Sequence, residues 1–287
     1  LLLTIPLTFY AHKARLFRHK WPTLLALVLQ LLTIFLASTR SALLAILVGG
    51  FLALVYKIFY GSRRVSKYSK ISFVALLVVA SLFFGFRTQL QESNIQTIKR
   101  VASISLTEST VASRLFLWKE ITPYVLDKPL GYGAENIGPI SNLVYDPSLI
   151  GEPWFDRSHN SFVDYAVQFG VLGLLLYLVL IGSLIKQGVG LHKEQDDLSG
   201  PILLVAVLYS VNNVFVFDTS LSLWMFLVIL AISFVWNSDD EKDALYEFEN
   251  TGFTGHILAA VILLAMIPVV ITPLRANIHL VGAHGAM

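Results

Sequence analysis

Long apolar runs without Asp, Glu, Lys or Arg recur along the chain and predict its organisation. A helix needs roughly 20 apolar residues, within a range of about 17–25, to cross the hydrocarbon core of a bilayer. Backbone polar groups in lipid must be satisfied within the spanning segment, so these runs are predicted to be helices. They lie at 21–39, 41–56, 71–86, 165–185, 198–217, 219–238 and 250–274. The pattern indicates an all-α, polytopic transmembrane bundle with seven full spans.

Lys and Arg in the short connections predict the orientation of these spans. The basic segments 12–20 and 57–70 lie on one side, which the positive-inside rule makes cytoplasmic. Alternation then assigns the other connections: Arg40, 87–161, 218–220 and 275–287 outside, and 186–197 and 239–249 inside.

The same pattern divides the chain into four parts. These are transmembrane helices with the Arg40 outer turn (1–86), an extracytoplasmic loop (87–161), transmembrane helices (162–274) and an outer tail (275–287). The chain starts at Leu1 within an apolar stretch, without a visible signal peptide. We therefore interpret 1–11 as the tail of an earlier span, and the sequence as lacking the spans before it.

Composition narrows the function classes. Of the 287 residues 55% are hydrophobic and 14% are charged, whereas a soluble domain has about 25% charged residues. This excludes an ordinary cytosolic enzyme, a nucleic-acid-binding domain and a disordered chain. The absence of Cys excludes a disulfide framework and a thiol nucleophile. The sequence has no H-E-x-x-H and no paired carboxylates in the outer loop, so we predict no metal site and no cofactor.

The loop 87–161 is rich in apolar and aromatic residues, unlike a low-complexity tether. Ser105 and Glu108 match a capping box before a helical stretch that ends near Thr122. The Pro-Leu-Gly-Tyr-Gly sequence at 129–133 is typical of a turn. The loop is either a surface helix with a turn or a folded cap over a site at the outer face. Long ordered loops are usually functional, which favours the cap.

Arg40 lies between two apolar runs, with Ser38, Thr39 and Ser41 around it. An ionisable residue near membrane depth is costly and is a functional-site candidate by default. Ser41 is expected to cap the next helix, whose N-terminus attracts anions. Arginine, hydroxyls and a helix N-terminus together predict a phosphate site. The alternative is an interfacial arginine that contacts lipid phosphates.

A second group lies at 156–161, where the outer loop re-enters the membrane. His159 there can act as general base or acid, because histidine titrates near neutrality. Asn160 is expected to orient His159 or to cap the helix, and Arg157 is a supporting candidate. Arg114, beside aromatic residues, and Asp218, in a short outer turn, are weaker candidates. For each the alternative is a purely structural residue at the membrane interface.

Three segments resemble a known family. S-T-R-S-A-L-L-A (38–45) resembles the arginine motif of the O-antigen ligase and polymerase family. S-R-L-F-L-W-K-E (113–120) and D-K-P-L-G-Y-G-A-E-N (127–136) are similar to its exported loop. H-N-S-F-V-D-Y-A-V-Q-F-G-V-L-G-L-L-L-Y (159–177) resembles its histidine motif and the following span. The resemblance covers roughly 20–235, and the order and spacing of the segments make it specific.

The resemblance implies a metal-independent, inverting membrane glycosyltransferase with a GT-C-like fold, at the outer face of the bacterial inner membrane. Its donor would be a glycan on undecaprenyl diphosphate, and its acceptor lipid A–core, another glycan or a protein. His159 would activate the acceptor hydroxyl, and Arg40 and Arg114 would bind the diphosphate. Ser38, Ser41, Asn160, Arg157 and Asp218 would support them. We expect no nucleic-acid partner.

A transporter or flippase is the alternative, with Arg40 at a helix break that binds an anionic substrate. The two halves of the chain show no internal repeat, and no second broken span matches the one at Arg40. A large outer loop also suits catalysis at one face better than alternating access. A non-catalytic scaffold would leave Arg40 and His159 unexplained.

Overall fold

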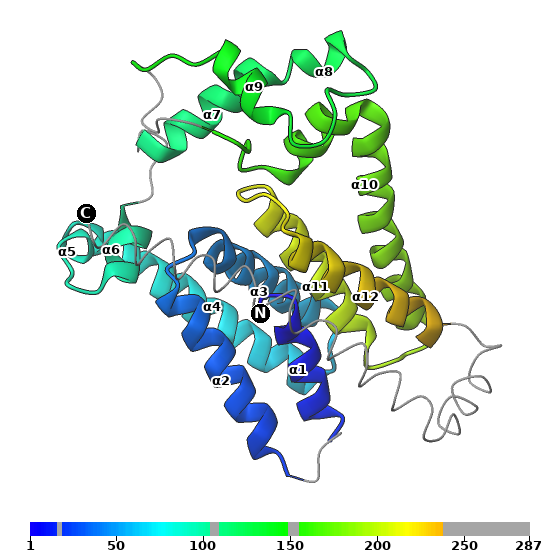
Figure 1. Ribbon diagram of the computed structural model, residues 1–287. Coiled ribbons are helices and arrows are strands. Elements are labelled where there is room, and N and C mark those ends of the chain that lie inside the picture. Colours follow the sequence, from blue (N-terminus) through cyan, green and yellow to red (C-terminus); the bar gives the residue numbers. More distant parts are fainter. Residues whose placement is uncertain (16–18, 104–108, 149–154, 238–287) are drawn as a thin grey trace, which may run out of the picture. The chain divides into compact units, whose positions relative to one another are not determined.

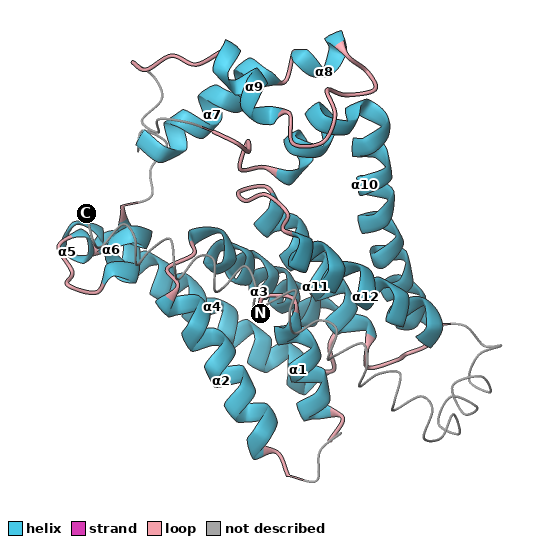
Figure 2. Ribbon diagram, viewed as in Figure 1, coloured by secondary structure: helices cyan, strands magenta, loops and turns pink. Residues whose placement is uncertain are grey.

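The computed structural model describes residues 1–15, 19–103, 109–148 and 155–237, which are built from helices (Figures 1 and 2). The predicted segments 239–249, 250–274 and 275–287, and the capping box at Ser105 and Glu108, lie outside the described residues. The helices are α1 (Thr4–Lys13), α2 (Trp21–Leu36), α3 (Arg40–Tyr60), α4 (Arg63–Gly85), α5 (Arg87–Gln91), α6 (Gln96–Ala102), α7 (Ser109–Ile121), α8 (Tyr124–Asp127), α9 (Ile137–Leu143), α10 (Ser161–Lys193), α11 (Ser199–Asn213) and α12 (Ser220–Trp236).

Helices α3, α4 and α10 are long and apolar enough to cross a membrane, with 21, 23 and 33 residues. The two apolar runs that look short in the sequence, 41–56 and 71–86, form longer helices that continue into the basic residues around 57–70. Helices α2, α11 and α12 are apolar but have 16, 15 and 17 residues. At 1.5 Å per residue these helices reach only about 22–26 Å. Three of the seven predicted spans are therefore long enough by themselves within the described residues.

The long helices expose much of their apolar surface. In the most apolar stretches of α3, α4 and α10, only 17%, 6% and 28% of the residues are buried. Val79 on α4 and Val179 on α10 are among the exposed side chains, at 62% and 61%. A water-soluble protein rarely exposes a continuous apolar surface of this kind. The chain is therefore an all-α membrane protein, and these faces fit contact with lipid.

Contacts between helices place the connections at two ends of the bundle. Helices α3 and α11 pack closely where Gly49 meets Leu204 and Leu208. The hydroxyl of Tyr56, late in α3, lies 2.9 Å from Nε2 of His192 near the end of α10. The amide of Ser161 donates to the Val216 carbonyl at 3.2 Å, which joins the start of α10 to the connection after α11.

These contacts make α3 antiparallel to α11. We call the end that carries Arg40, 155–161 and 214–219 the His159 end. We call the end that carries 57–70 and 193–199 the Tyr56 end. Within the described residues, the connections at Arg40, 155–161 and 214–219 therefore lie at the opposite end from those at 57–70 and 193–199.

The turn sequence 129–133 packs against a break in α10. Gly170 has φ 68° and ψ −167°, so the helix is interrupted there. The amide of Val171 donates to the Pro129 carbonyl at 3.0 Å instead of continuing the helical pattern. The amides of Tyr132 and Gly133 donate to Val167 and Gln168, both at 2.9 Å. The break thus holds the loop by backbone hydrogen bonds, and the segment from Val171 onward can still span a membrane.

The connection between α11 and α12 differs from the prediction. The sequence pattern predicted a run to residue 217 and a turn at 218–220, whereas α11 ends at Asn213 and α12 begins at Ser220. Thr219 and Ser222 form a capping box at the start of α12. The Thr219 side chain accepts from the Ser222 amide, and the Ser222 hydroxyl oxygen accepts from the Thr219 amide. The uncharged run does not reveal this earlier helix end, because 214–217 is apolar although it is not helical.

Candidate functional site

The segment before α10 is fixed by hydrogen bonds from three directions. The indole Nε1 of Trp118 on α7 donates to the Ser158 carbonyl at 2.6 Å. The amide and hydroxyl of Ser158 donate to Oδ1 of Asp164 at 2.9 and 2.5 Å. Asn160 caps α10 by accepting from the amides of the two residues after Ser161. This confirms the helix-cap alternative for Asn160.

His159 lies at the centre of this fixed segment. Its backbone is left-handed, with φ 57°, a conformation that residues other than Gly adopt rarely and at a cost. Its half-buried ring packs against Phe155, with ring centroids 6.0 Å apart, and against Phe217, with centroids 5.6 Å apart. Because Ser158 and Asn160 on either side are buried and bonded, the imidazole has a defined direction. Such preorganisation is what a general base requires.

Arg114 and His159 meet the same connection, 214–219. Nη1 of Arg114 on α7 donates to the Phe215 carbonyl at 3.2 Å, while the His159 ring contacts Phe217. The Ser161 hydroxyl also donates to the Val216 carbonyl at 3.1 Å. The structure therefore brings Arg114 and His159 to the same connection, although they belong to separate motifs at 113–120 and 159–177.

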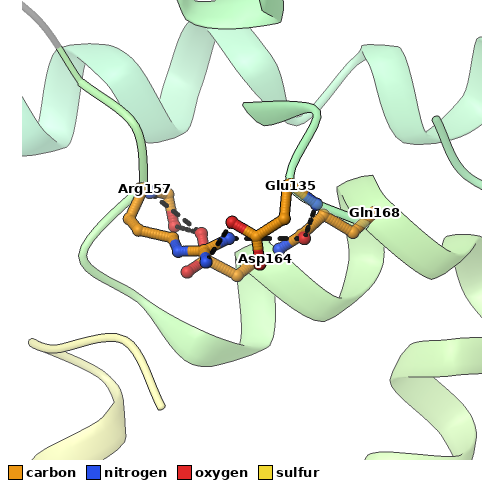
Figure 3. A network of polar contacts seen from close by, with 5 residues as sticks. Glu135, Arg157, Asp164 and Gln168 are labelled. Atoms are coloured by element: carbon orange, nitrogen blue, oxygen red, sulfur yellow. Dashed lines mark hydrogen bonds and ion pairs between the residues drawn. The ribbon is translucent and has the colours of Figure 1, made fainter. Parts of the chain in front are cut away.

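Arg157 belongs to a polar network beside His159 (Figure 3). Its guanidinium forms an ion pair with Glu135 and donates to Gln168 Oε1 at 3.4 Å. The hydrogen bond to Glu135 raises the pKa of Arg157. Gln168 Oε1 also accepts from the Glu135 amide at 2.6 Å, and the guanidinium carbon lies 6.0 Å from the Phe217 ring centroid. Arg157 therefore links the loop around 135 to α10 and to the 214–219 connection.

Arg40 begins α3 at the His159 end, and its side chain is half-buried. The neighbouring Ser41 differs from the prediction that it caps α3. Thr39 is the residue before the helix, and Ser41 lies within its first turn, buried, with a hydroxyl that bonds to none of the described residues. Ser41 therefore does not cap α3. Ser38, with φ 53°, is buried and its hydroxyl lies 2.7 Å from Thr97 Oγ1 of α6.

Asp218 lies in a tyrosine network. It accepts hydrogen bonds from the hydroxyls of Tyr209, of Tyr177 at 3.4 Å and of Ser222 at 2.6 Å. The side-chain Nδ2 of Asn213 donates to the Tyr177 hydroxyl at 2.9 Å. This network anchors the 214–219 connection to α10, α11 and α12. Asp218 therefore helps to hold in place the connection that contacts the His159 ring.

Several contacts of this site were not predicted from the sequence. Asp164 lies five positions after His159, and its side chain holds the turn through Ser158. The polar Nε1 of Trp118 makes the contact with the Ser158 carbonyl. The isolated Gly170 inside an apolar run was a usable signal for a break, because glycine there weakens a helix.

The residues at this site are arginines and a histidine rather than a cluster of metal ligands. Within the described ranges no three His, Asp or Glu side chains form a group that could hold a metal ion. Arg40, Arg114 and Arg157 are among the charged groups at the His159 end. An arginine can donate two parallel hydrogen bonds to phosphate oxygens. The arrangement is therefore suited to an anionic group next to a histidine.

The comparison with protein families agrees with the motifs. The family model described as O-antigen ligase matches residues 25–178, more than half of the chain. The chain belongs to the O-antigen ligase family. The matched range contains Arg40, Arg114 and His159, whereas Asp218 and its tyrosine partner Tyr209 lie beyond it.

Proteins similar to this chain occur in Rickettsia under the name "Putative polysaccharide ligase". The protein of Rickettsia conorii is 26% identical over 168 residues, that of Rickettsia felis 28% over 173, and that of Rickettsia bellii 27% over 169. Each alignment covers 56% of this chain and 39% of the relative. The aligned part thus amounts to about two fifths of the length of these relatives.

Proposed function

We propose that this protein is a membrane glycosyltransferase that moves a glycan from undecaprenyl diphosphate to an acceptor hydroxyl. The reaction would take place at the outer face of the bacterial inner membrane, with the His159 end outward. The observation that carries the proposal is the convergence of Arg114 and His159 on the 214–219 connection, with Arg40 at the same end. Membership of the O-antigen ligase family supports it.

The proposed reaction is an inverting displacement. The acceptor oxygen attacks the anomeric carbon of the donor glycan, and its proton passes to the His159 ring. The bond between that carbon and the diphosphate oxygen breaks, and undecaprenyl diphosphate leaves with the bonding electrons. Negative charge then builds up on the leaving diphosphate. Fixed cations lower the energy of such a transition state without a metal ion, and this is the role proposed for Arg40 and Arg114.

The polar contacts around His159 suit this chemistry. A base must keep its orientation while substrates bind, and the bonds of Ser158 to Trp118 and Asp164 fix the backbone before it. Asn160 fixes the backbone after it through the helix cap. Ser38, Arg157 and Asp218 would act by positioning, because their side chains bond to Thr97, Glu135 and Tyr209. Ser41 would support the buried first turn of α3.

The experiment is a transfer assay with the full-length protein in detergent. It contains an undecaprenyl-diphosphate-linked glycan, EDTA and, separately, lipid A–core, free lipid-linked glycan or an acceptor protein. We expect His159→Ala and Arg114→Ala to lower the rate by about 100-fold or more, the usual contribution of a general base or a charge-stabilising donor. His192→Ala and Arg64→Ala, at the Tyr56 end, are matched controls and should keep the wild-type rate.

The product identifies the acceptor. Modified lipid A–core would indicate a ligase, and a ladder of longer lipid-linked chains would indicate a polymerase. Activity lost in EDTA and restored by Mg²⁺ would refute the metal-independent mechanism. Full activity in both site variants would refute the site. Movement of donor across vesicles without any transfer product would favour a flippase.

A further inference from the structure

A shallow cavity lies at the Tyr56 end, where α3 turns into α4. Its volume is about 490 Å³, and three basic and three apolar side chains contribute to its lining. The basic side chains are Arg63, Lys67 and Lys70, and the apolar ones are Ile58, Phe59 and Ile71. The cavity is remote from the proposed catalytic site, because α3 separates its Tyr56 end from Arg40 by the length of a 21-residue helix.

The three cations share one face of α4. Positions 63, 67 and 70 follow the spacing i, i+4 and i+7, which places side chains above one another on a helix. The Ser66 hydroxyl, on the same face, donates to the Ile58 carbonyl at 2.8 Å and ties this face to the end of α3. The cations therefore line a wall of the cavity together.

Among the residues that the structure describes, no carboxylate pairs with this charge. The first 91 residues contain no Asp or Glu, and Glu92 is the first acidic residue of the sequence. Two acids at the Tyr56 end are engaged elsewhere: Lys13 pairs with Asp197 at 2.5 Å, and the Trp236 indole donates to Asp196 at 2.9 Å. Within the described parts of the chain, the three cavity cations form no ion pair with a carboxylate.

The apolar side of the cavity indicates what kind of anion fits. Phe59 is 76% exposed and the adjacent Tyr60 is 77% exposed, next to two helices whose apolar faces suit lipid. Aromatic residues gather where the hydrocarbon core meets the headgroups. A phosphate alone would use the cations and leave the apolar wall in water. A phospholipid would use both.

We propose that this cavity binds the headgroup of an anionic membrane phospholipid. The phosphate would contact Arg63, Lys67 and Lys70, and the first part of the acyl chains would cover Ile58, Phe59 and Ile71. Basic pockets between transmembrane helices bind such headgroups. The site holds a structural lipid at the end opposite to the proposed catalytic centre, and its occupancy does not depend on the transfer reaction.

Binding of fluorescent phosphatidylglycerol in detergent micelles to the full-length protein tests this site. The cavity variant replaces Arg63, Lys67 and Lys70 by Gln. A control variant replaces Arg64, Lys186 and Lys193 by Gln, which removes the same charge at the same end but outside the cavity lining. Each cation near an anionic lipid surface contributes about 1 kcal/mol, which is roughly a factor of five in affinity. We therefore expect the cavity variant, which lacks three cations, to bind the lipid on the order of 100-fold more weakly. The control should stay within about threefold of the wild type, because it keeps all three cavity cations.

Four results would overturn the proposal. These are equal loss in both variants, unchanged binding by the cavity variant, equal binding of zwitterionic phosphatidylcholine, and displacement of phosphatidylglycerol by inorganic phosphate at the same concentration. The first would mean that overall charge attracts the lipid, and the last that the cavity takes a free phosphate. Circular dichroism of both variants should match the wild type, since all six side chains lie at the surface.

Discussion

The contact between Gly170 and the 129–133 turn gives the sharpest prediction about structure. A Cβ at Gly170 would lie 1.9 Å from the Pro129 carbonyl oxygen and 2.7 Å from the Gly131 nitrogen. The backbone conformation of Gly170 is also one that almost only glycine adopts. Gly170→Ala must therefore either straighten α10 or displace the turn. In both cases the amides of Tyr132 and Gly133 lose their acceptors.

The size of the effect follows from the hydrogen bonds that are lost. Three backbone bonds join the turn to α10, and at about 1 kcal/mol each they stabilise the docked turn by roughly 3 kcal/mol. Opening of the turn should then become on the order of 100-fold more frequent, since about 1.4 kcal/mol corresponds to a factor of ten.

Hydrogen exchange followed by mass spectrometry in detergent measures this opening directly. The amides of Tyr132 and Gly133 should exchange on the order of 100-fold faster in Gly170→Ala, as expected when a local structure opens more often. Gly182→Ala is the matched control, because a Cβ at Gly182, in the same helix, meets no atom within 4 Å. Unchanged protection of Tyr132 and Gly133 in Gly170→Ala would refute the reasoning, as would an equal increase in Gly182→Ala.

Two further variants test the segment that carries the histidine, by thermal unfolding in detergent followed by circular dichroism. Asn160→Ala removes the acceptor of the Phe162 and Val163 amides and should lower the free energy of unfolding by about 1 kcal/mol; Asn160→Asp keeps the oxygen, and an equal loss in both would contradict the cap. Asp164→Ala leaves the buried Ser158 amide unpaired, while the Ser158 hydroxyl can still donate to the Asn160 carbonyl, and should cost roughly 1–3 kcal/mol. Wild-type stability of Asp164→Ala would show that the two bonds do not hold the turn.

Short motifs in the sequence indicated the family and its candidate residues. Long apolar runs without charged residues predicted the helices. The helical stretch up to about Thr122 agrees with α7, which ends at Ile121. Within α7, Leu117 and Ile121 are fully buried whereas Leu115 is 44% exposed, although all three are apolar. A helical repeat gives the spacing of a face but not the direction in which the tertiary structure turns it.

What the sequence by itself determined is local. Uncharged runs give helices because lipid leaves their backbone groups no other partners, and Asn160 caps α10 because its acceptor lies within three residues of the amides it serves. The tertiary structure alone decided the contacts that assemble the site. Arg114 meets Phe215 across 101 positions and Trp118 meets Ser158 across 40. Contacts over such separations depend on how whole helices pack, and no single segment carries that information.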